Sequence, residues 1–177
     1  MSTFYMVEMH YPASEDRALF DKFYNKHITM LLTIDGFFSA QRYETTHEAR
    51  APFLAVYKLR DPGVMESTNY TSKAGRTSVN PTFRDKMSNW DRNLVQGDID
   101  TMNVPDGGEM VLIDRLTPDS PPLPEGFTAL EIVGLDATIV QRGVRIIKKG
   151  ESVLPEGPID SWTVRTLRPL HAPRYSD

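Results

Sequence analysis

The chain of 177 residues contains no cysteine. Disulfide bonds, thiolate catalysis and cysteine-ligated zinc or iron–sulfur centres are therefore excluded. No apolar run approaches the roughly 20 residues that a membrane-spanning helix needs, so no membrane partner is expected. The opening residues, MSTFYMVEMHYP, lack a basic region followed by an apolar stretch, which is unlike a secretory signal peptide. A cytoplasmic location is the resulting expectation.

A strong charge of one sign is also missing, because the formal net charge is only -4 at pH 7. No basic patch is interleaved with aromatic residues, so we expect no nucleic-acid partner. The 4 histidines show no HxH or HExxH spacing, and no GxGxxG, P-loop or GxSxG motif occurs. The sequence therefore predicts neither a metal site nor a cofactor.

What the chain does contain is an ordinary globular composition, with 40% hydrophobic and 25% charged residues. Its first predicted element is a strand over residues 3–11, which is rich in aromatic and β-favouring residues. Alternation along a strand divides it into two faces. One face carries Phe4, Met6, Glu8 and His10, and the other carries Tyr5, Val7, Met9 and Tyr11. Two ionisable groups on one face of so apolar a strand are candidates for chemistry.

A helix is predicted next, with Ser14 as a possible N-cap and acidic residues in the first turn. An aromatic stripe at helical spacing is formed by Phe20, Phe23, Tyr24, His27 and Leu31. The helical region ends at Asp35 and Gly36. A histidine in such a stripe is unusual, and two interpretations stay open. It either bonds a backbone group inside a packed core or faces a cavity.

The following segments predict a hairpin of strands over residues 37–46 and 52–61. Helical pieces are expected within residues 62–94, where Phe83, Met87, Trp90 and Leu94 have helical spacing. A fourth strand is expected over residues 108–117, with residues 95–102 as the competing segment. This order of elements is typical of a ferredoxin-like α+β unit.

The chain changes character towards its end, because nine of its 13 prolines lie beyond residue 104. Three strands are expected there, within residues 127–135, 138–149 and 160–170. We therefore divide the chain into a ferredoxin-like unit, residues 1–116, and a second segment, residues 117–177. The second segment is a proline-rich linker with a β-rich C-terminal extension, or a degenerate second repeat of the first unit.

The segment FYNKHITMLLTIDGFFSAQRYE resembles the dimeric α/β-barrel superfamily, in particular its EthD-like members. The residues that carry the resemblance are Phe23, Tyr24, His27, Gly36, Phe37, Arg42 and Tyr43. Relatives often have a proline two residues after the histidine, where this chain has Thr29. The resemblance implies a barrel made of two ferredoxin-like sheets, either in a homodimer or in a pseudo-dimer, and a cavity for a small ligand.

The superfamily hosts several chemistries, so the fold does not choose among them. We expect an enzyme in which His27 transfers a proton, with His10 and Glu8 as further catalytic candidates. The expected substrate is a hydrophobic small molecule, aromatic or polyketide-like, in an apolar barrel cavity. Its expected contacts are Tyr24, Phe37, Tyr43, Tyr57 and Trp90.

Lyase, isomerase or cyclase chemistry without a cofactor is the main functional hypothesis. The first alternative is a cofactor-free monooxygenase that acts on an activated phenol or enol. The second is a non-catalytic protein that binds a hydrophobic metabolite. In a third alternative the barrel is only a dimerisation core and holds no ligand.

Overall fold

The computed structural model describes residues 1–115, 117–119, 121–151 and 162–177. The first part of the chain forms β1 (Ser2–His10), α1 (Arg17–Leu31), β2 (Phe37–Thr45), β3 (Phe53–Leu59), η1 (Pro62–Glu66), α2 (Thr68–Lys73), η2 (Arg76–Ser78), α3 (Pro81–Arg84) and β4 (Ser88–Gly97). The second part forms β5 (Glu109–Arg115), β6 (Thr128–Leu135), β7 (Gln141–Ile147), β8 (Trp162–Pro169) and β9 (Arg174–Tyr175). No helix in the described ranges has the length and apolar character needed to cross a membrane.

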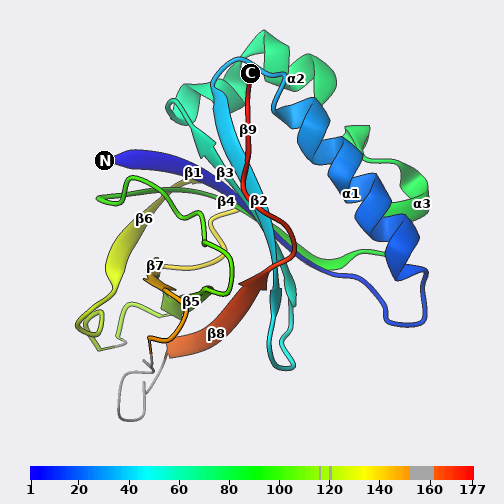
Figure 1. The fold of residues 1–177 in the computed structure, drawn as a ribbon. Coiled ribbons are helices and arrows are strands. Elements are labelled where there is room, and N and C mark those ends of the chain that lie inside the picture. The colour runs from blue at the N-terminus through cyan, green and yellow to red at the C-terminus, as the bar shows by residue number, and fades with distance from the viewer. Residues whose placement is uncertain (116, 120, 152–161) are drawn as a thin grey trace.

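The strands close into an antiparallel barrel within this one chain (Figure 1). Around the barrel the order is β3–β1–β4–β6–β7–β5–β8–β2, and β2 pairs again with β3. The short β9 adds to β2 at Ser39 and Ala40. The predicted α+β class and the barrel are confirmed, and the three strands expected in the proline-rich region are β6, β7 and β8.

The two halves of the barrel have the same strand order. In the first half it is β2–β3–β1–β4, and in the second half it is β6–β7–β5–β8. The fourth strand of each half pairs with the second strand of the other half, in the pairs β4–β6 and β8–β2. The halves therefore occupy equivalent places in the barrel. The division expected at residue 116 and the segment 152–161 lie outside the described residues.

Two predictions about the middle of the chain were wrong. The strand that pairs with β1 is β4, whereas Glu109–Arg115 forms β5 and pairs with β7 and β8. Trp90 and Leu94 lie on β4 and not on a helix. The spacing was ambiguous because residues four apart share a face in a strand as well as in a helix. The first helix begins later than expected, since Asp16 is its N-cap and accepts from the backbone N–H of Leu19 at 3.0 Å.

Helices cover the outer face of the first half, and the helices of the described residues all lie there (Figure 1). There α1 packs its stripe on β1 and β3, in an apolar cluster that includes Tyr5, Phe20, Tyr24 and Tyr57. In the second half, the described residues before β6 take the place of helices. Leu123 and Phe127 pack against the outer side of β5, and the Trp162 indole N–H donates to the carbonyl of Pro121 at 3.2 Å.

The barrel interior is filled by apolar side chains and by four charged residues from four strands. Arg142 is 0% exposed and donates to Asp114 at 2.6 Å, and it also contacts Glu8. Arg165 bridges the same two carboxylates, at 2.9 Å to Asp114 and 3.0 Å to Glu8. Burial alone raises the pKa of Glu8, but the two guanidinium groups outweigh it and hold that pKa at about 2.

We expect Arg142→Met to lower the free energy of unfolding by about 3–5 kcal/mol, because it leaves buried carboxylates without one of their cations. Urea denaturation followed by circular dichroism measures the change. Arg168→Met is the matched control, since Arg168 pairs with Glu109 at 2.9 Å while its side chain is 70% exposed. That pair should contribute about 1 kcal/mol or less. Equal losses in the two variants would contradict the assigned role of Arg142.

Candidate functional site

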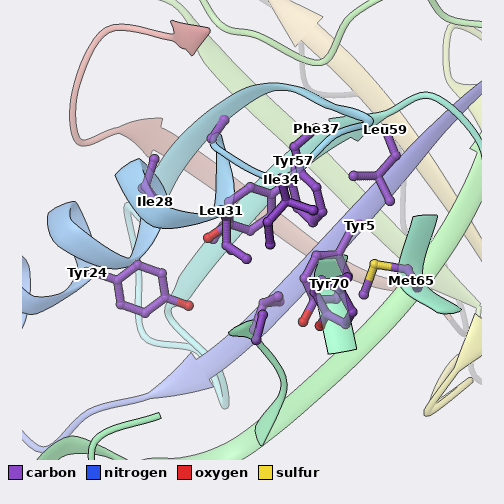
Figure 2. Packing of buried hydrophobic residues seen from close by; sticks show 14 of the residues in the cluster. Tyr5, Tyr24, Ile28, Leu31, Ile34, Phe37, Tyr57, Leu59, Met65 and Tyr70 are labelled. Atoms are coloured by element: carbon purple, nitrogen blue, oxygen red, sulfur yellow. The ribbon is translucent and has the colours of Figure 1, made fainter. Parts of the chain in front are cut away.

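A pocket lies between helix α1 and the outer face of the sheet, and His27 lines it. Its walls come from five elements, with Tyr5 on β1, Trp90 and Arg92 on β4, Tyr70 on α2 and Arg76 on η2. Figure 2 shows Tyr24, Tyr5 and Tyr70 with their rings in the layer between α1 and the strands. The pocket is narrow, so a ring-sized ligand requires side chains at its rim to move.

His27 faces this pocket without a hydrogen-bond partner for its ring among the described residues. Its contacts are aromatic, with ring-centroid distances of 5.9 Å to Phe23 and 5.8 Å to Tyr24. Burial lowers the pKa of His27 from 6.5 to about 4, because the apolar surroundings disfavour the imidazolium. The imidazole is therefore neutral near pH 7, with a lone pair available to accept a proton. This placement favours the cavity interpretation of His27 over the backbone-bonded one.

The helix carries His27 on a regular turn. Thr29 stands where relatives of the resembled superfamily often have proline, and α1 continues through it to Leu31. The Thr29 hydroxyl donates to the carbonyl of Asn25 at 3.0 Å, which is a common interaction within a helix. His27 thus keeps its helical spacing from Phe20 and Tyr24 and lies on the same face of α1 as these two residues.

Two arginines bring positive charge to the pocket, and one carboxylate is shared between them. Arg76 forms an ion pair with Asp136, and it donates to the carbonyl of Trp90 at 2.6 Å. The Arg92 guanidinium lies 3.7 Å from the same carboxylate. Two cations facing one anion leave a net positive charge at the rim. Such a field stabilises negative charge that develops on a ligand inside the pocket.

Two N–H donors of the pocket walls are buried and have no partner in the described part of the chain: Trp90 Nε1 and Arg92 Nε. A buried donor without an acceptor costs about 1–3 kcal/mol, so a water molecule or a ligand oxygen normally satisfies it. Both donors belong to neighbouring outward-facing positions of β4. They indicate where an oxygen atom of a ligand would bind.

The hydroxyls of Tyr5 and Tyr24 in the pocket remain protonated at neutral pH. Burial raises the pKa of Tyr24 to about 12, and burial together with the Tyr70 hydroxyl raises the pKa of Tyr5 well above 10. They can donate hydrogen bonds but do not act as bases. His27, whose imidazole is neutral and has a free lone pair, is therefore the candidate base of this pocket.

The predicted site residues divide between the two faces of the sheet. Tyr24, His27 and Trp90 line the pocket together. Phe37 and Tyr57 pack behind it in the same apolar cluster, where Tyr57 stacks on Tyr5 at 5.5 Å. Tyr5 had been assigned to the strand face opposite Glu8, and that face is the one under the helices.

Glu8, Tyr43 and His10 lie away from this pocket. Glu8 belongs to the charged group inside the barrel. The single Tyr43 O–H lies between two acceptors, Oε1 of Gln41 at 2.8 Å and the carbonyl of Met102 at 2.9 Å. His10 is at the end of β1, with its Nδ1 3.3 Å from the Ser88 hydroxyl. The three predicted catalytic residues, His27, His10 and Glu8, are thus not brought together. The expected cavity inside the barrel is also not where His27 points.

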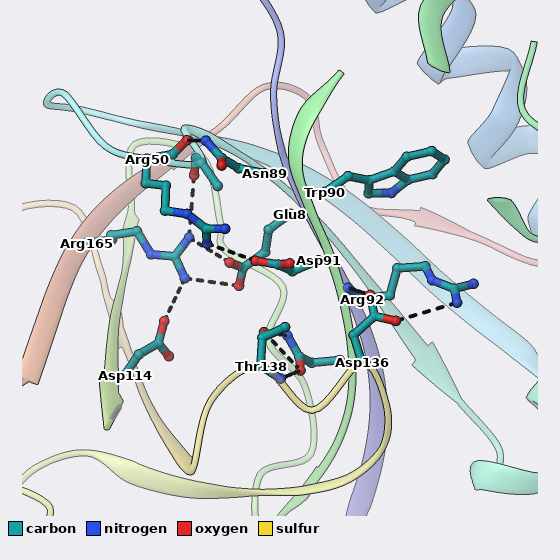
Figure 3. Close-up of polar contacts among 12 residues, drawn as sticks. Glu8, Arg50, Asn89, Trp90, Asp91, Arg92, Asp114, Asp136, Thr138 and Arg165 are labelled. Atoms are coloured by element: carbon teal, nitrogen blue, oxygen red, sulfur yellow. Dashed lines mark hydrogen bonds and ion pairs between the residues drawn. The ribbon is translucent and has the colours of Figure 1, made fainter. Parts of the chain in front are cut away.

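Figure 3 shows the separation between the two faces of the sheet. Trp90 and Arg92 project to the side of the helices, while Glu8, Asp114 and Arg165 lie on the barrel side. A second hollow opens on that side and includes these three residues, whose charges are balanced together with Arg142. Within the described ranges no group of three or more histidine, aspartate or glutamate residues is arranged to hold a metal ion. The pocket under α1 is therefore the stronger candidate for chemistry.

Arg76, Arg92 and Asp136 were not anticipated from the sequence. Arg92 lies in a piece that was expected to be helical, which hid the strand face that Arg92 shares with Trp90. Asp136 follows β6, 60 residues from Arg76 and 44 from Arg92, so no local pattern could connect it to them.

Solved structures share this fold. An anthrone oxidase-like protein matches with a TM-score of 0.63 and 11% identity, over 99% of this chain and 93% of that one. A candidate monooxygenase from Lactobacillus acidophilus NCFM matches with a TM-score of 0.58 and 11% identity, over the full length of both chains. At this identity the likeness shows the fold alone. No family model matches the chain. No curated protein matches it either.

We expect the His27 imidazole to titrate with a midpoint near pH 4, and NMR of the histidine ring protons measures it. A pKa that is lower in the folded than in the unfolded chain gives a stability contribution that is present above pH 6.5 and lost as the pH falls towards 4. The free energy of unfolding should therefore fall less across this range in His27→Gln than in the unmodified chain. The histidine ring-proton signal that is missing from the spectrum of His27→Gln is the signal of His27. A midpoint at pH 6 or above would contradict the lowered pKa of His27.

Proposed function

We propose that the protein is a cofactor-independent monooxygenase that acts on a small aromatic phenol or enol in the pocket under α1. The observation that supports this most directly is a neutral, unbonded His27 in an apolar pocket whose rim carries excess positive charge. The two structural neighbours, an anthrone oxidase-like protein and a candidate monooxygenase, favour this chemistry over lyase or isomerase chemistry.

The first step is deprotonation of the substrate by His27. A carbon or oxygen acid next to an aromatic system loses a proton to the imidazole and becomes a delocalised anion. The low pKa of His27 makes the imidazole a weak base, so proton transfer depends on stabilising that anion. The net charge of the Arg76, Arg92 and Asp136 group and the unpartnered Trp90 N–H supply this stabilisation.

Molecular oxygen is the oxidant in the second step. For a substrate with a reactive CH₂ group, such as an anthrone, the carbanion gives up electrons to O₂ and forms a C–O bond, which yields a peroxide anion. The His27 imidazolium returns its proton to that anion. The hydroperoxide then loses water, since its C–H proton leaves with the distal oxygen as the O–O bond breaks. A ketone remains, so CH₂ and O₂ become C=O and H₂O.

The apolar walls assist this cycle in two ways. They disfavour the imidazolium of His27, and so promote return of the proton to the peroxide. They also exclude bulk water, which strengthens the attraction between the substrate anion and the guanidinium groups. Tyr5 and Tyr24, which stay protonated, can orient substrate oxygens as donors.

Proton transfer without oxygen is the second candidate function. A lyase, isomerase or cyclase would use the same His27 base and the same anion-stabilising rim, and it would return the proton to another atom of the substrate. A protein that only binds a hydrophobic aromatic compound would use the same walls without turnover. Oxygen consumption separates these functions, because only the monooxygenase requires it.

The architecture is also proposed to be pseudo-dimeric. The shared strand order of the two halves supports a ferredoxin-like unit that is present twice, with a second copy that has no helices in its described residues. Because one chain closes the barrel, closure does not require a second chain. Homodimer formation remains a separate proposal, which the mass of the protein in solution tests.

We expect the protein to convert anthrone to anthraquinone with uptake of one O₂ per substrate, measured with an oxygen electrode above the uncatalysed rate. His27→Gln should lower kcat by about 10²–10⁴-fold, the usual contribution of a positioned acid–base group. His47→Gln is the control, since His47 is exposed in the loop between β2 and β3. Consumption of a tested aromatic without oxygen uptake would favour the lyase or isomerase function. Unchanged kcat in His27→Gln would remove the proposed base.

A further inference from the structure

Asp136 connects the second half of the barrel to the pocket of the first half. It follows β6, and its backbone N–H donates to the carbonyl of Arg92 at 2.9 Å. The Arg92 backbone N–H in turn donates to the Asp136 carboxylate at 2.9 Å. Two residues further, the Thr138 N–H donates to Asn93 at 3.1 Å. The segment after β6 is thus fastened to β4 beside the pocket (Figure 3).

The backbone around this connection is in an unfavourable conformation. Leu135 and Ala137, on either side of Asp136, have φ values of 67° and 48°. Asn89, which precedes Trp90, has a φ of 49°. Residues with a Cβ atom rarely adopt this left-handed region, and such residues gather at ligand-binding and catalytic sites. In the described chain, every non-glycine residue with positive φ flanks either Asp136 or Trp90.

The side chains of Arg76, Arg92 and Asp136 together carry a net positive charge beside the pocket. Asp136 offers one carboxylate to the guanidinium groups of Arg76 and Arg92, and its side chain is only 20% exposed. Arg92 is 18% exposed, and its buried Nε has no acceptor in the described ranges. The Trp90 indole N–H is unpartnered on the same side of β4. One further negative charge, placed among these donors, would balance the site.

We propose that Asp136 is a positioning residue that holds Arg76 and Arg92 at the pocket, and that the arrangement selects an aromatic ligand with one negative charge. The ligand charge lies on oxygen atoms that accept from Arg92 and Trp90, and the ring lies among the aromatic walls near His27. This rests on the pocket of the proposed function, in which the substrate carries this charge once His27 has removed its proton, and it names the class of ligand that the pocket holds most tightly. A neutral ring of the same shape would contact the same walls after the same movement of the rim, but it would leave the donors without a charged acceptor.

A pair of probes with the same shape tests the charge selection. 2-Naphthoate carries one carboxylate, and 2-naphthamide replaces it by a neutral amide. Binding of each is measured by isothermal titration calorimetry at pH 7. We expect naphthoate to bind at least about tenfold more tightly, because hydrogen bonds to a charged acceptor are stronger than those to a neutral one. Equal affinity, or no binding of either probe at millimolar concentration, would overturn the proposal.

Three substitutions test the positioning role. Arg92→Gln should remove the preference for naphthoate while the affinity for naphthamide stays the same. Asp136→Asn should weaken naphthoate binding by about tenfold although the pocket gains positive charge, because the guanidinium groups lose their anchor. Asp136→Glu should restore part of the preference. Tighter naphthoate binding in Asp136→Asn would show that Asp136 only competes with the ligand, and would overturn its positioning role.

The control is Asp91→Asn, which removes a carboxylate from the adjacent position of β4. Asp91 pairs with Arg50 at 3.0 Å on the other face of the sheet, so this change should leave both affinities as they are. Naphthamide binding reports that each variant retains a folded pocket. These measurements involve no turnover, so a failed oxygen assay with intact charge selection would reject the monooxygenase and leave the inference standing. Oxygen-dependent turnover without a preference for naphthoate would reject the inference alone.

Discussion

Strand β1 is buried on both faces from Thr3 to Met9, and this constraint separates the polar groups of the protein into two environments. Each side chain of this stretch must find a partner either inside the barrel or under the helices, since neither face meets water there. The helix side receives Tyr5, Val7 and Met9, which pack against the stripe of α1. The barrel side receives Phe4 and Met6 among apolar residues. Glu8 is on the barrel side too, and burial of its charge requires cations from other strands.

Those cations come from the second half of the chain, which makes the two halves depend on each other. Arg142 on β7 and Arg165 on β8 form ion pairs with Glu8. Asp114 on β5 is the second carboxylate, so two negative charges balance the two guanidinium groups. Asp114 meets both arginines within the second half, on the paired strands β5, β7 and β8. Of the four residues, Glu8 is the one whose charge is paired only when the two halves come together. Buried ionic groups of this kind often contribute more to a unique arrangement of elements than to stability.

The sequence predicted the parts of the molecule that depend on local periodicity. The faces of β1, the aromatic stripe of α1 and the strands of the proline-rich region follow from alternation or helical spacing, and each is found. The position of His27 in an aromatic stripe was also sufficient to single it out. What the sequence could not provide was which face of β1 the helix covers, so Glu8 and His27 were expected together although they lie on opposite faces.

Trp90 illustrates a second limit of periodicity. Its spacing from Leu94 fits a helix and a strand alike, so the prediction of a helix concealed Arg92, which lies between them on the same face of β4. Asp136 was out of reach for another reason. It meets Arg76 across 60 residues of sequence, through the β4–β6 pairing that joins the two halves. Contacts of this type depend on the topology of the whole barrel and leave no trace in the neighbouring residues.

The described residues of the second half form no helix, and this fits the position of the pocket. The first half keeps α1 and the short helices, which form the roof over Tyr5, Trp90 and His27. In the described residues, the equivalent outer face of the second half is covered directly by Leu123, Phe127 and Trp162. The second half contributes to the pocket from the side, through the barrel that it closes and the carboxylate of Asp136.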